Sequence, residues 1–362
     1  MKITHVQVYT LDLPYAGGVY RLSGGREFRS FRSLITRLET DMGLVGWGES
    51  CPFGGTYIAT HADAVAAALA TLAPAILGLD PRQHDRVYDA MDAVLLGQLP
   101  AKAALDMACW DLAGQVAGVP VCDLLGGRVA EAVASISSIA ADAPEAMRAA
   151  VQHHRDLDFQ GHSIKIGASE MEGGPGLDAA RLTAVLTDRQ PGEWFLADAN
   201  NGLSTEHALR LFEYLPKGCD FVLEAPCATW RETLVVREKC PYPIMLDELV
   251  QTDADVVEAI RHNACDGLNL KISKQGGLTR CRVQRDMARA AGMTVSIQDT
   301  WGGDISRAAI QHLACSTPQS MIRFALDTSP FIEGHFASFD PMAPGLGVRP
   351  DVKALGSPLI TV

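Results

Sequence analysis

The sequence lacks paired cysteines. Its nine cysteines are scattered singly, with no Cys-x-x-Cys pair and no His–Cys cluster. This pattern argues against a disulfide framework or a zinc site, and it indicates free thiols in a reducing compartment. The N-terminal stretch alternates like a strand and has no signal-peptide core, and no apolar run reaches the ~20 residues that span a membrane. We therefore expect a cytoplasmic protein.

Positive charge is in deficit as well. The 31 lysines and arginines face 43 aspartates and glutamates, which gives a formal net charge of −12. This balance argues against nucleic acid or an anionic membrane as a partner. It is compatible with an anionic substrate, because a bound metal ion can dominate the local charge. With 362 residues, of which 48% are hydrophobic, the chain has room for a barrel and an accessory domain.

The spacing of apolar residues divides the sequence into two regions. Residues 3–14, 33–40 and 44–50 predict strands of a meander, and residues 62–119 predict helices. From about residue 133 the pattern changes to eight strand-like runs that alternate with helical stretches, which predicts a closed parallel barrel of the α/β class. A tail rich in Pro and Gly follows the eighth run in place of a helix. The runs are VASISSIA, HSIKIG, WFLAD, FVLE, PIMLD, GLNLKI, MTVSIQD and SMIRFAL.

Three acids end three successive runs of this region. Asp198 closes WFLAD, Glu224 closes FVLE and Asp247 closes PIMLD. A single Asp after a strand is often only the N-cap of the next helix. In a parallel barrel, however, the carboxyl ends of all strands meet at one face, and crowded carboxylates repel unless a cation lies between them. The three acids therefore predict an oxygen cage suited to Mg²⁺.

Two lysines flank the acids. Lys165 lies in SIKIG and Lys271 in GLNLKIS, on the second and sixth of the eight runs, which places them nearly opposite each other around the ring. Each is either an end-of-strand lysine that extends to solvent or an acid–base group at the barrel mouth. Burial and a nearby cation are expected to lower the pKa of both. Lys274, three residues after Lys271, is expected to be a solvated or structural charge.

Further candidates lie in the loops. Asp299 and Trp301 follow the seventh strand in QDTWGGDIS, where Trp301 is either a wall of the substrate site or packing at the rim. Asp327 follows the eighth strand and either contacts a cationic substrate nitrogen or caps a turn. Two loops of the first region are candidates to fold over the barrel mouth, although a lone aromatic residue in a loop more often serves packing. Their residues are Tyr20, Arg21, Phe53, Thr56, Tyr57 and His61.

Several motifs occur together: VGWGES near residue 47, AKAALDMACWDLAGQVAGVPVCDLLGG, the second-strand lysine, the three acids, and DGLNLKISKQGGL. In this combination, over nearly the whole chain, they resemble the enolase superfamily, in its mandelate racemase/muconate lactonizing enzyme branch. The resemblance implies a (β/α)7β barrel over residues 126–325 and an α+β capping domain from residues 1–125 and 326–362. It also implies one Mg²⁺ and a step in which a base removes the proton α to a carboxylate and the metal stabilises the enediolate.

One position departs from this branch. Many muconate-lactonizing members carry Lys-x-Lys on the second strand, and here Ser163 stands at the first of these positions. Lys165 matches the usual catalytic lysine, so the base is retained. Without a neighbouring cation, the pKa of Lys165 should be depressed less. We expect Ser163 and Tyr57 to contact substrate, together with Asp299, Trp301 and Asp327.

Within the branch, WGESCPFGGTYIATH and DTWGGDI resemble hydroxyproline-betaine 2-epimerases and cis-3-hydroxy-L-proline dehydratases. A betaine nitrogen has no N–H and suits aromatic faces, whereas an imino acid carries NH₂⁺ and gains from a carboxylate such as Asp327. The dehydratase is therefore the favoured function and the epimerase the alternative, with the same two lysines in both. A cycloisomerase, a dipeptide epimerase, or a barrel that only binds are further interpretations. The expected partners are a small carboxylate, a proline derivative, and further copies of the chain.

Overall fold

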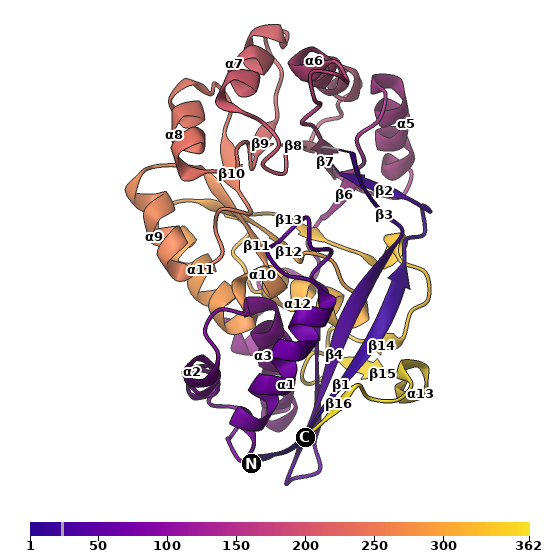
Figure 1. The fold of residues 1–362 in the computed structure, drawn as a ribbon, viewed down its shortest axis with the longest axis vertical. Coiled ribbons are helices and arrows are strands. Elements are labelled where there is room, and N and C mark those ends of the chain that lie inside the picture. Colours follow the sequence, from indigo (N-terminus) through magenta and orange to yellow (C-terminus); the bar gives the residue numbers. More distant parts are fainter. Residues whose placement is uncertain (23–24) are drawn as a thin grey trace.

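The computed structural model of the protein describes residues 1–22 and 25–362. Within these residues the chain forms a closed barrel of eight parallel strands and a separate antiparallel sheet with its own helices (Figure 1). The predicted α/β barrel with a capping domain is therefore confirmed. The division at residues 125 and 325 remains our proposal for the domain boundaries.

The sheet of the capping domain joins both ends of the chain. Its strand order is β16-β1-β4-β5, with β1 Ile3–Pro14, β4 Ser30–Thr40, β5 Val45–Ser50 and β16 Ile360–Thr361. All neighbouring pairs are antiparallel, and the pairing of β16 with β1 brings the two termini side by side (Figure 1). The three strands predicted at the start of the sequence are correct, with β4 beginning three residues earlier than expected.

Helices cover one face of this sheet. They are α1 Ala62–Ile76 and α3 Leu99–Ala117; α2 His84–Val94 packs on these two helices, and the short α4 Val121–Leu124 packs on α3 and on α12 Asp304–Cys315. Alternate side chains of the long strands pack into two different hydrophobic cores, because successive residues of a strand point to opposite faces. Leu34 packs with the helices, whereas Ile35 packs toward the barrel. A Cβ at Gly48 would lie 1.9 Å from the carbonyl oxygen of Ala104 in α3, so only glycine permits this close approach.

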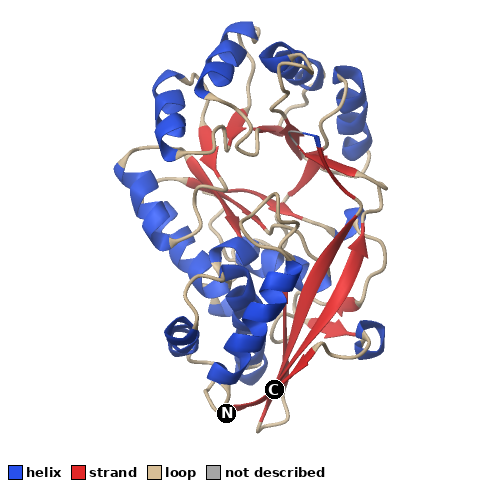
Figure 2. Cartoon of the chain, viewed as in Figure 1, coloured by secondary structure: helices blue, strands red, loops and turns tan. Residues whose placement is uncertain are grey.

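The barrel follows the predicted alternation of strands and helices. Its cyclic order is β6-β7-β8-β9-β10-β11-β12-β13, and helices surround it (Figure 2). The strands are β6 Ser135–Ile139, β7 Gly161–Lys165, β8 Trp194–Asp198, β9 Val222–Glu224, β10 Ile244–Leu246, β11 Gly267–Lys271, β12 Thr294–Gln298 and β13 Ile322–Leu326. The helices are α5 Pro144–Arg155, α6 Gly174–Leu186, α7 Thr205–Tyr214, α8 Trp230–Lys239, α9 Asp253–Arg261, α10 Ile272–Gln275, α11 Leu278–Ala290 and α12 Asp304–Cys315.

The last segment of the chain leaves the barrel without an α-helix after β13. It forms the 3₁₀ turn η2 Ser329–Phe331, the hairpin of β14 Ala337–Phe339 and β15 Val348–Pro350, and the short α13 Val352–Leu355, before β16. A second hairpin, β2 Tyr20–Leu22 with β3 Arg26–Phe28, extends from the capping domain toward β6 and β7 (Figure 1). In the described part of the chain, every helix is too short or too polar to cross a lipid bilayer.

Candidate active site

The three predicted acids lie side by side at one end of the barrel. Asp198 is the last residue of β8, Glu224 is the last residue of β9, and Asp247 directly follows β10. Asp198 and Glu224 are directly paired across their strands, and Glu224 pairs with Met245 on the other side. Each of the three acids is at most 2% exposed. The strand-end pattern in the sequence thus predicted their position correctly.

The two predicted lysines face each other across one cavity. Lys165 ends β7 and Lys271 ends β11, and these strands are four positions apart in both directions around the ring. Both lysines line the same cavity and are less than 8% exposed. Lys165 Nζ donates a hydrogen bond to Asp198 Oδ2, and Lys271 Nζ donates one to Asp247 Oδ2 at 2.5 Å. The strands that carry the acids occupy the arc between them.

Lys274 is buried, and the expectation that it is solvated is wrong. Lys274 lies in the short helix α10, which follows β11 directly. Its Nζ donates hydrogen bonds to the backbone oxygen of Asp247 at 2.5 Å and to Asp247 Oδ1 at 2.6 Å. The residue is 2% exposed. Lys274 therefore holds one oxygen of Asp247 while Lys271 holds the other, which matches the alternative expectation of a structural charge.

Replacing Lys274 by methionine should lower the free energy of unfolding by about 3 kcal/mol, because it removes one of the two buried cations that hold Asp247 and leaves this carboxylate with Lys271 alone. Urea denaturation of the purified variant measures this. The exposed Lys239 provides the matched control, and Lys239→Met should change stability by less than about 0.5 kcal/mol. Equal effects of the two substitutions would show that Lys274 does not hold Asp247.

The charges at the site shift the pKa values of both lysines upward. Burial lowers the pKa of Lys165, but Asp198, Tyr20 and Glu224 raise it more strongly. Burial likewise lowers the pKa of Lys271, and Asp247 and the other nearby carboxylates outweigh it. The protein groups alone therefore do not lower the pKa of the two lysines as predicted, because the carboxylates stabilise the charged ammonium forms. A lower pKa requires a cation that compensates these carboxylates.

The acids also affect one another. Burial raises the pKa of Glu224 well above its usual range, and the nearby Asp198 and Asp247 raise it further. Burial and Asp247 raise the pKa of the adjacent Glu248 to about 7. Oδ1 of Asn269, whose amide donates to Glu224 at 2.6 Å, is buried without a partner among the described residues. Crowded carboxylates and unpaired buried oxygens fit a hard divalent cation, as Mg²⁺ prefers oxygen ligands.

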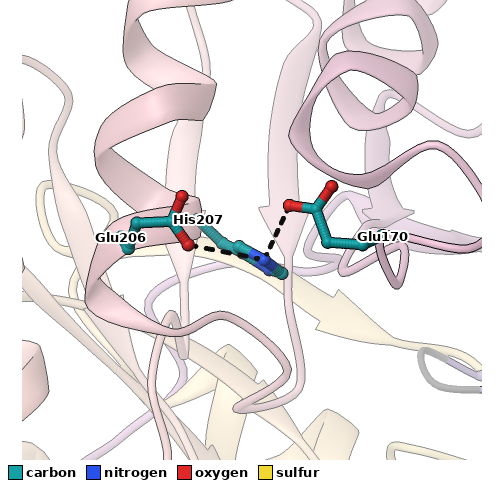
Figure 3. Close-up of side chains that lie close together, drawn as sticks. All are labelled: Glu170, Glu206 and His207. Atoms are coloured by element: carbon teal, nitrogen blue, oxygen red, sulfur yellow. Dashed lines mark ion pairs between the residues drawn. The ribbon is translucent and has the colours of Figure 1, made fainter.

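A second group of acids lies on the surface. Glu170, Glu206 and His207 are the described residues whose potential ligand atoms all lie within 4.8 Å of one another, a spacing that the three buried acids do not reach (Figure 3). His207 Nε2 lies 3.1 Å from Glu170 and 3.7 Å from Glu206. Arg210 pairs with both glutamates, at 2.5 and 2.9 Å. Arg210 therefore already compensates part of the negative charge of this surface group.

Aromatic residues from both domains form part of the cavity wall. Tyr20, Phe53 and Tyr57 come from the two candidate loops of the capping domain, and Trp301 follows β12. The ring centroids of Tyr20 and Trp301 are 5.5 Å apart, and those of Phe53 and Trp301 are 5.8 Å apart. Trp301 thus both lines the cavity and packs against the capping domain. Arg21, Thr56 and His61 are not among the described residues that line it.

The remaining predicted contacts divide into two groups. Ser163 and Asp299 line the cavity, and Ser163 Oγ accepts a hydrogen bond from Lys165 Nζ at 3.5 Å. Burial raises the pKa of Asp299 to about 7, although its oxygens accept hydrogen bonds from Ser273. Asp327 is absent from the described lining. Its Oδ1 instead accepts from the backbone N–H of Ser329 at 2.9 Å and lies 3.1 Å from Arg307 Nε.

Sequence reasoning missed several polar residues at the site. Asn200 lines the cavity, and its side-chain amide donates to Asp198 Oδ2 at 3.1 Å and to Glu248 Oε1 at 3.2 Å. Ser138 of β6 lines the cavity and shares a hydrogen bond with Tyr20 Oη. Asn269 was detectable in principle, because it stands two residues before Lys271 and therefore on the same face of the strand. Asn200 and Ser138 had no comparable signal.

Comparison with family models identifies the family of the chain. Residues 28–126 match the N-terminal domain of mandelate racemase / muconate lactonizing enzymes, and residues 142–354 match the enolase C-terminal domain-like family. The chain belongs to the mandelate racemase/muconate lactonizing enzyme family of the enolase superfamily. The resemblance inferred from the sequence motifs is therefore confirmed, and the protein belongs to a family of enzymes.

Members of this family with several activities are similar to the chain. A cis-3-hydroxy-L-proline dehydratase from Roseibium aggregatum is 36% identical over 99% of both chains. An N-succinyl-L-Arg/Lys racemase from Bacillus cereus is 27% identical, with 87% of this chain and 85% of the relative covered. A hydrophobic dipeptide epimerase from Enterococcus faecalis and muconate cycloisomerase 1 from Rhodococcus opacus are also similar. These relatives support enolase-superfamily chemistry, but they differ in reaction and substrate.

Solved structures of the superfamily superimpose closely on this enzyme. A protein from Roseovarius nubinhibens ISM, assigned to the mandelate racemase/muconate lactonizing enzymes and complexed with magnesium, is 58% identical with a TM-score of 0.99 over the full length of both chains. Another enolase superfamily member from the same organism, also complexed with magnesium, is 35% identical with a TM-score of 0.92 over 100% of this chain and 99% of the other.

Proposed function

We propose that this enzyme dehydrates cis-3-hydroxy-L-proline to Δ1-pyrroline-2-carboxylate. The observation that carries the proposal is the pair Lys165 and Lys271, which line one cavity from strands four positions apart around the ring. Elimination of water across C2 and C3 needs a base and an acid on different sides of the substrate, and this pair provides both. The dehydratase from Roseibium aggregatum, 36% identical over 99% of both chains, supports this substrate.

Magnesium is the metal that we propose for the site. Asp198, Glu224 and Asp247 would hold it, because they are buried oxygen donors at adjacent strand ends. When bound, Mg²⁺ supplies positive charge that stabilises the negative charge developing on the substrate carboxylate. Asn200 and Asn269 keep two of the acids oriented through their side-chain amides.

The lysines carry the proton transfers in this mechanism. In cis-3-hydroxy-L-proline the hydroxyl is cis to the carboxylate, so the C2 hydrogen and the hydroxyl lie on opposite ring faces. One lysine removes the C2 proton, and the electron pair of that C–H bond forms the C2–C3 double bond. The other lysine protonates the departing hydroxyl, which leaves as water. The resulting enamine tautomerises to Δ1-pyrroline-2-carboxylate.

A second candidate is 2-epimerisation of proline betaine or 4-hydroxyproline betaine. Two observations favour it. Tyr20, Phe53 and Trp301 give the cavity an aromatic wall, which suits a quaternary nitrogen. Asp327, the carboxylate that favoured a free imino acid, instead contacts Ser329 and Arg307. In this reaction one lysine would remove the C2 proton and the other would return a proton to the opposite face.

Wild-type enzyme with Mg²⁺, assayed on both compounds side by side, distinguishes the two candidates. We expect cis-3-hydroxy-L-proline to be dehydrated with a higher kcat/KM than that for betaine epimerisation. The dehydration is followed through its product, and the epimerisation through optical rotation. Faster turnover of the betaine would make the epimerase the function. Turnover of neither compound would reject both candidates and direct the search to the dipeptide and N-succinyl amino acid substrates of the other relatives.

A further inference from the structure

Each of the two lysines is associated with a tyrosine of the capping domain. On one side, Lys271 Nζ donates a hydrogen bond to Tyr57 Oη and lies 4.8 Å from the centroid of the Tyr57 ring. Tyr57 Oη in turn donates to Asp247 Oδ2 at 3.1 Å. The tyrosine thus contacts Lys271 through both its hydroxyl and its ring, and it contacts the acid that pairs with this lysine.

On the other side, two neighbouring serines lie between Tyr20 and Lys165. Tyr20 Oη shares a hydrogen bond of 2.5 Å with Ser138 Oγ on β6. Ser138 is directly paired with Ser163 on β7, and Ser163 Oγ accepts from Lys165 Nζ at 3.5 Å. Tyr20, Ser138, Ser163 and Lys165 all line the cavity. Tyr20 therefore holds the serine that neighbours, on the adjacent strand, the serine bonded to Lys165.

The two tyrosines share one packing partner. The Phe53 ring centroid lies 5.0 Å from that of Tyr57 and 5.8 Å from that of Tyr20. Phe53 has a φ of +63°, a left-handed conformation that is uncommon for a bulky residue, so its backbone conformation is maintained by its surroundings. The packing joins the two loops, whereas the two hydroxyls have different partners: Tyr57 Oη contacts Lys271, and Tyr20 Oη contacts Ser138 beside the strand that carries Lys165.

We propose that the capping domain positions the two lysines separately, Tyr57 acting on Lys271 and Tyr20 acting on Lys165. This inference rests on the proposed function, in which each lysine serves one face of the substrate. A lysine side chain is flexible, and proton transfer requires its Nζ within hydrogen-bond reach of the C2 proton. An acceptor hydroxyl near each ammonium restricts that motion. Tyr57 is therefore a positioning residue, and the proposal extends its predicted role as a substrate contact.

The variants Tyr57→Phe and Tyr20→Phe test the proposal, because each removes only a hydroxyl and keeps the ring. The probes are the L and D forms of proline betaine, which have no 3-hydroxyl to eliminate, and the readout is C2 deuterium exchange in D₂O. Tyr57→Phe should slow exchange of one enantiomer about tenfold, the effect of losing one hydrogen bond, and leave the other within about twofold. Tyr20→Phe should instead slow exchange of the other enantiomer and leave the first within about twofold.

If the two tyrosines only stabilised the packing of the capping domain, the variants would give a different pattern of exchange rates. Phe53→Leu provides the comparison, since it removes the packing that both tyrosines share and should slow both enantiomers to a similar extent. If either tyrosine variant slows the two enantiomers equally, or if both variants slow the same enantiomer, the proposal is wrong.

Crystal structures of the two variants supply a readout that is independent of substrate. We expect Nζ of Lys271 to move in Tyr57→Phe while Lys165 stays in place, and the reverse in Tyr20→Phe. If wild-type enzyme exchanges neither enantiomer and turns over no cis-3-hydroxy-L-proline, the proposed function fails, and the crystal structures then decide this inference. Unchanged lysine positions in both variants would overturn it.

Discussion

Glu224→Gln is expected to reduce turnover at least about a thousandfold while leaving the fold intact. Glu224 is the central acid of the three, and it is 1% exposed between β8 and β10. Loss of one charged ligand removes several kcal/mol of electrostatic stabilisation, and each 1.36 kcal/mol corresponds to a factor of ten in rate. Steady-state kinetics at saturating Mg²⁺ measure the effect. Glu206→Gln, in the surface group of Figure 3, is the matched control and should retain wild-type activity.

The same substitution makes a prediction about stability. Burial and the neighbouring Asp198 and Asp247 raise the pKa of Glu224, which means that the charged form is unfavourable in the folded protein. A neutral glutamine keeps an oxygen for the Asn269 amide and removes the repulsion. In metal-free buffer, Glu224→Gln should therefore unfold at a temperature equal to or higher than that of wild type. A clear decrease in Tm, or full activity of wild type after exhaustive chelation, would contradict the proposed metal site.

Replacing either Lys165 or Lys271 by alanine should reduce dehydration by about a hundredfold to ten-thousandfold, the usual contribution of one acid–base group. The two variants should differ in C2 deuterium exchange. Loss of the base stops exchange, whereas loss of the acid leaves exchange in place and blocks elimination. Monitoring both processes in one NMR experiment assigns the two roles. The exposed Lys217→Ala is the control, and near-normal elimination by both active-site variants would rule out the two-lysine mechanism.

The sequence predicted the barrel because its signals are local. Each strand is a short apolar run, and an acid or lysine at its end must lie at the carboxyl face of a parallel barrel. Asp198, Glu224 and Lys165 occupy the ends of their strands as expected. Leu326 of β13 lines the cavity, whereas the adjacent Asp327 does not. Asp327 lies beyond the end of β13, where contacts with Ser329 and Arg307 hold its side chain, and no strand pattern in the sequence predicts these contacts.

Contacts between the two domains could not be predicted in this way. Tyr57 contacts Lys271 across 214 residues of sequence, and Tyr20 contacts Ser138 across 118. No periodicity relates such distant positions, and the loops were recognisable only as candidates to cover the barrel. The burial of Lys274 was missed for a different reason. It depends on the short helix α10, which begins directly after β11 and ends at Gly276 with a φ of +94°.

Proton NMR of cis-3-hydroxy-L-proline incubated in D₂O with wild-type enzyme and Mg²⁺ tests the central claim most directly. The claim is that two lysines beside a magnesium site remove the C2 proton of a proline derivative and expel its 3-hydroxyl. We predict loss of the C2–H signal and appearance of Δ1-pyrroline-2-carboxylate, both abolished by chelation of the metal. The claim would be contradicted if this compound, and proline derivatives that lack the 3-hydroxyl, kept their C2–H signals after prolonged incubation.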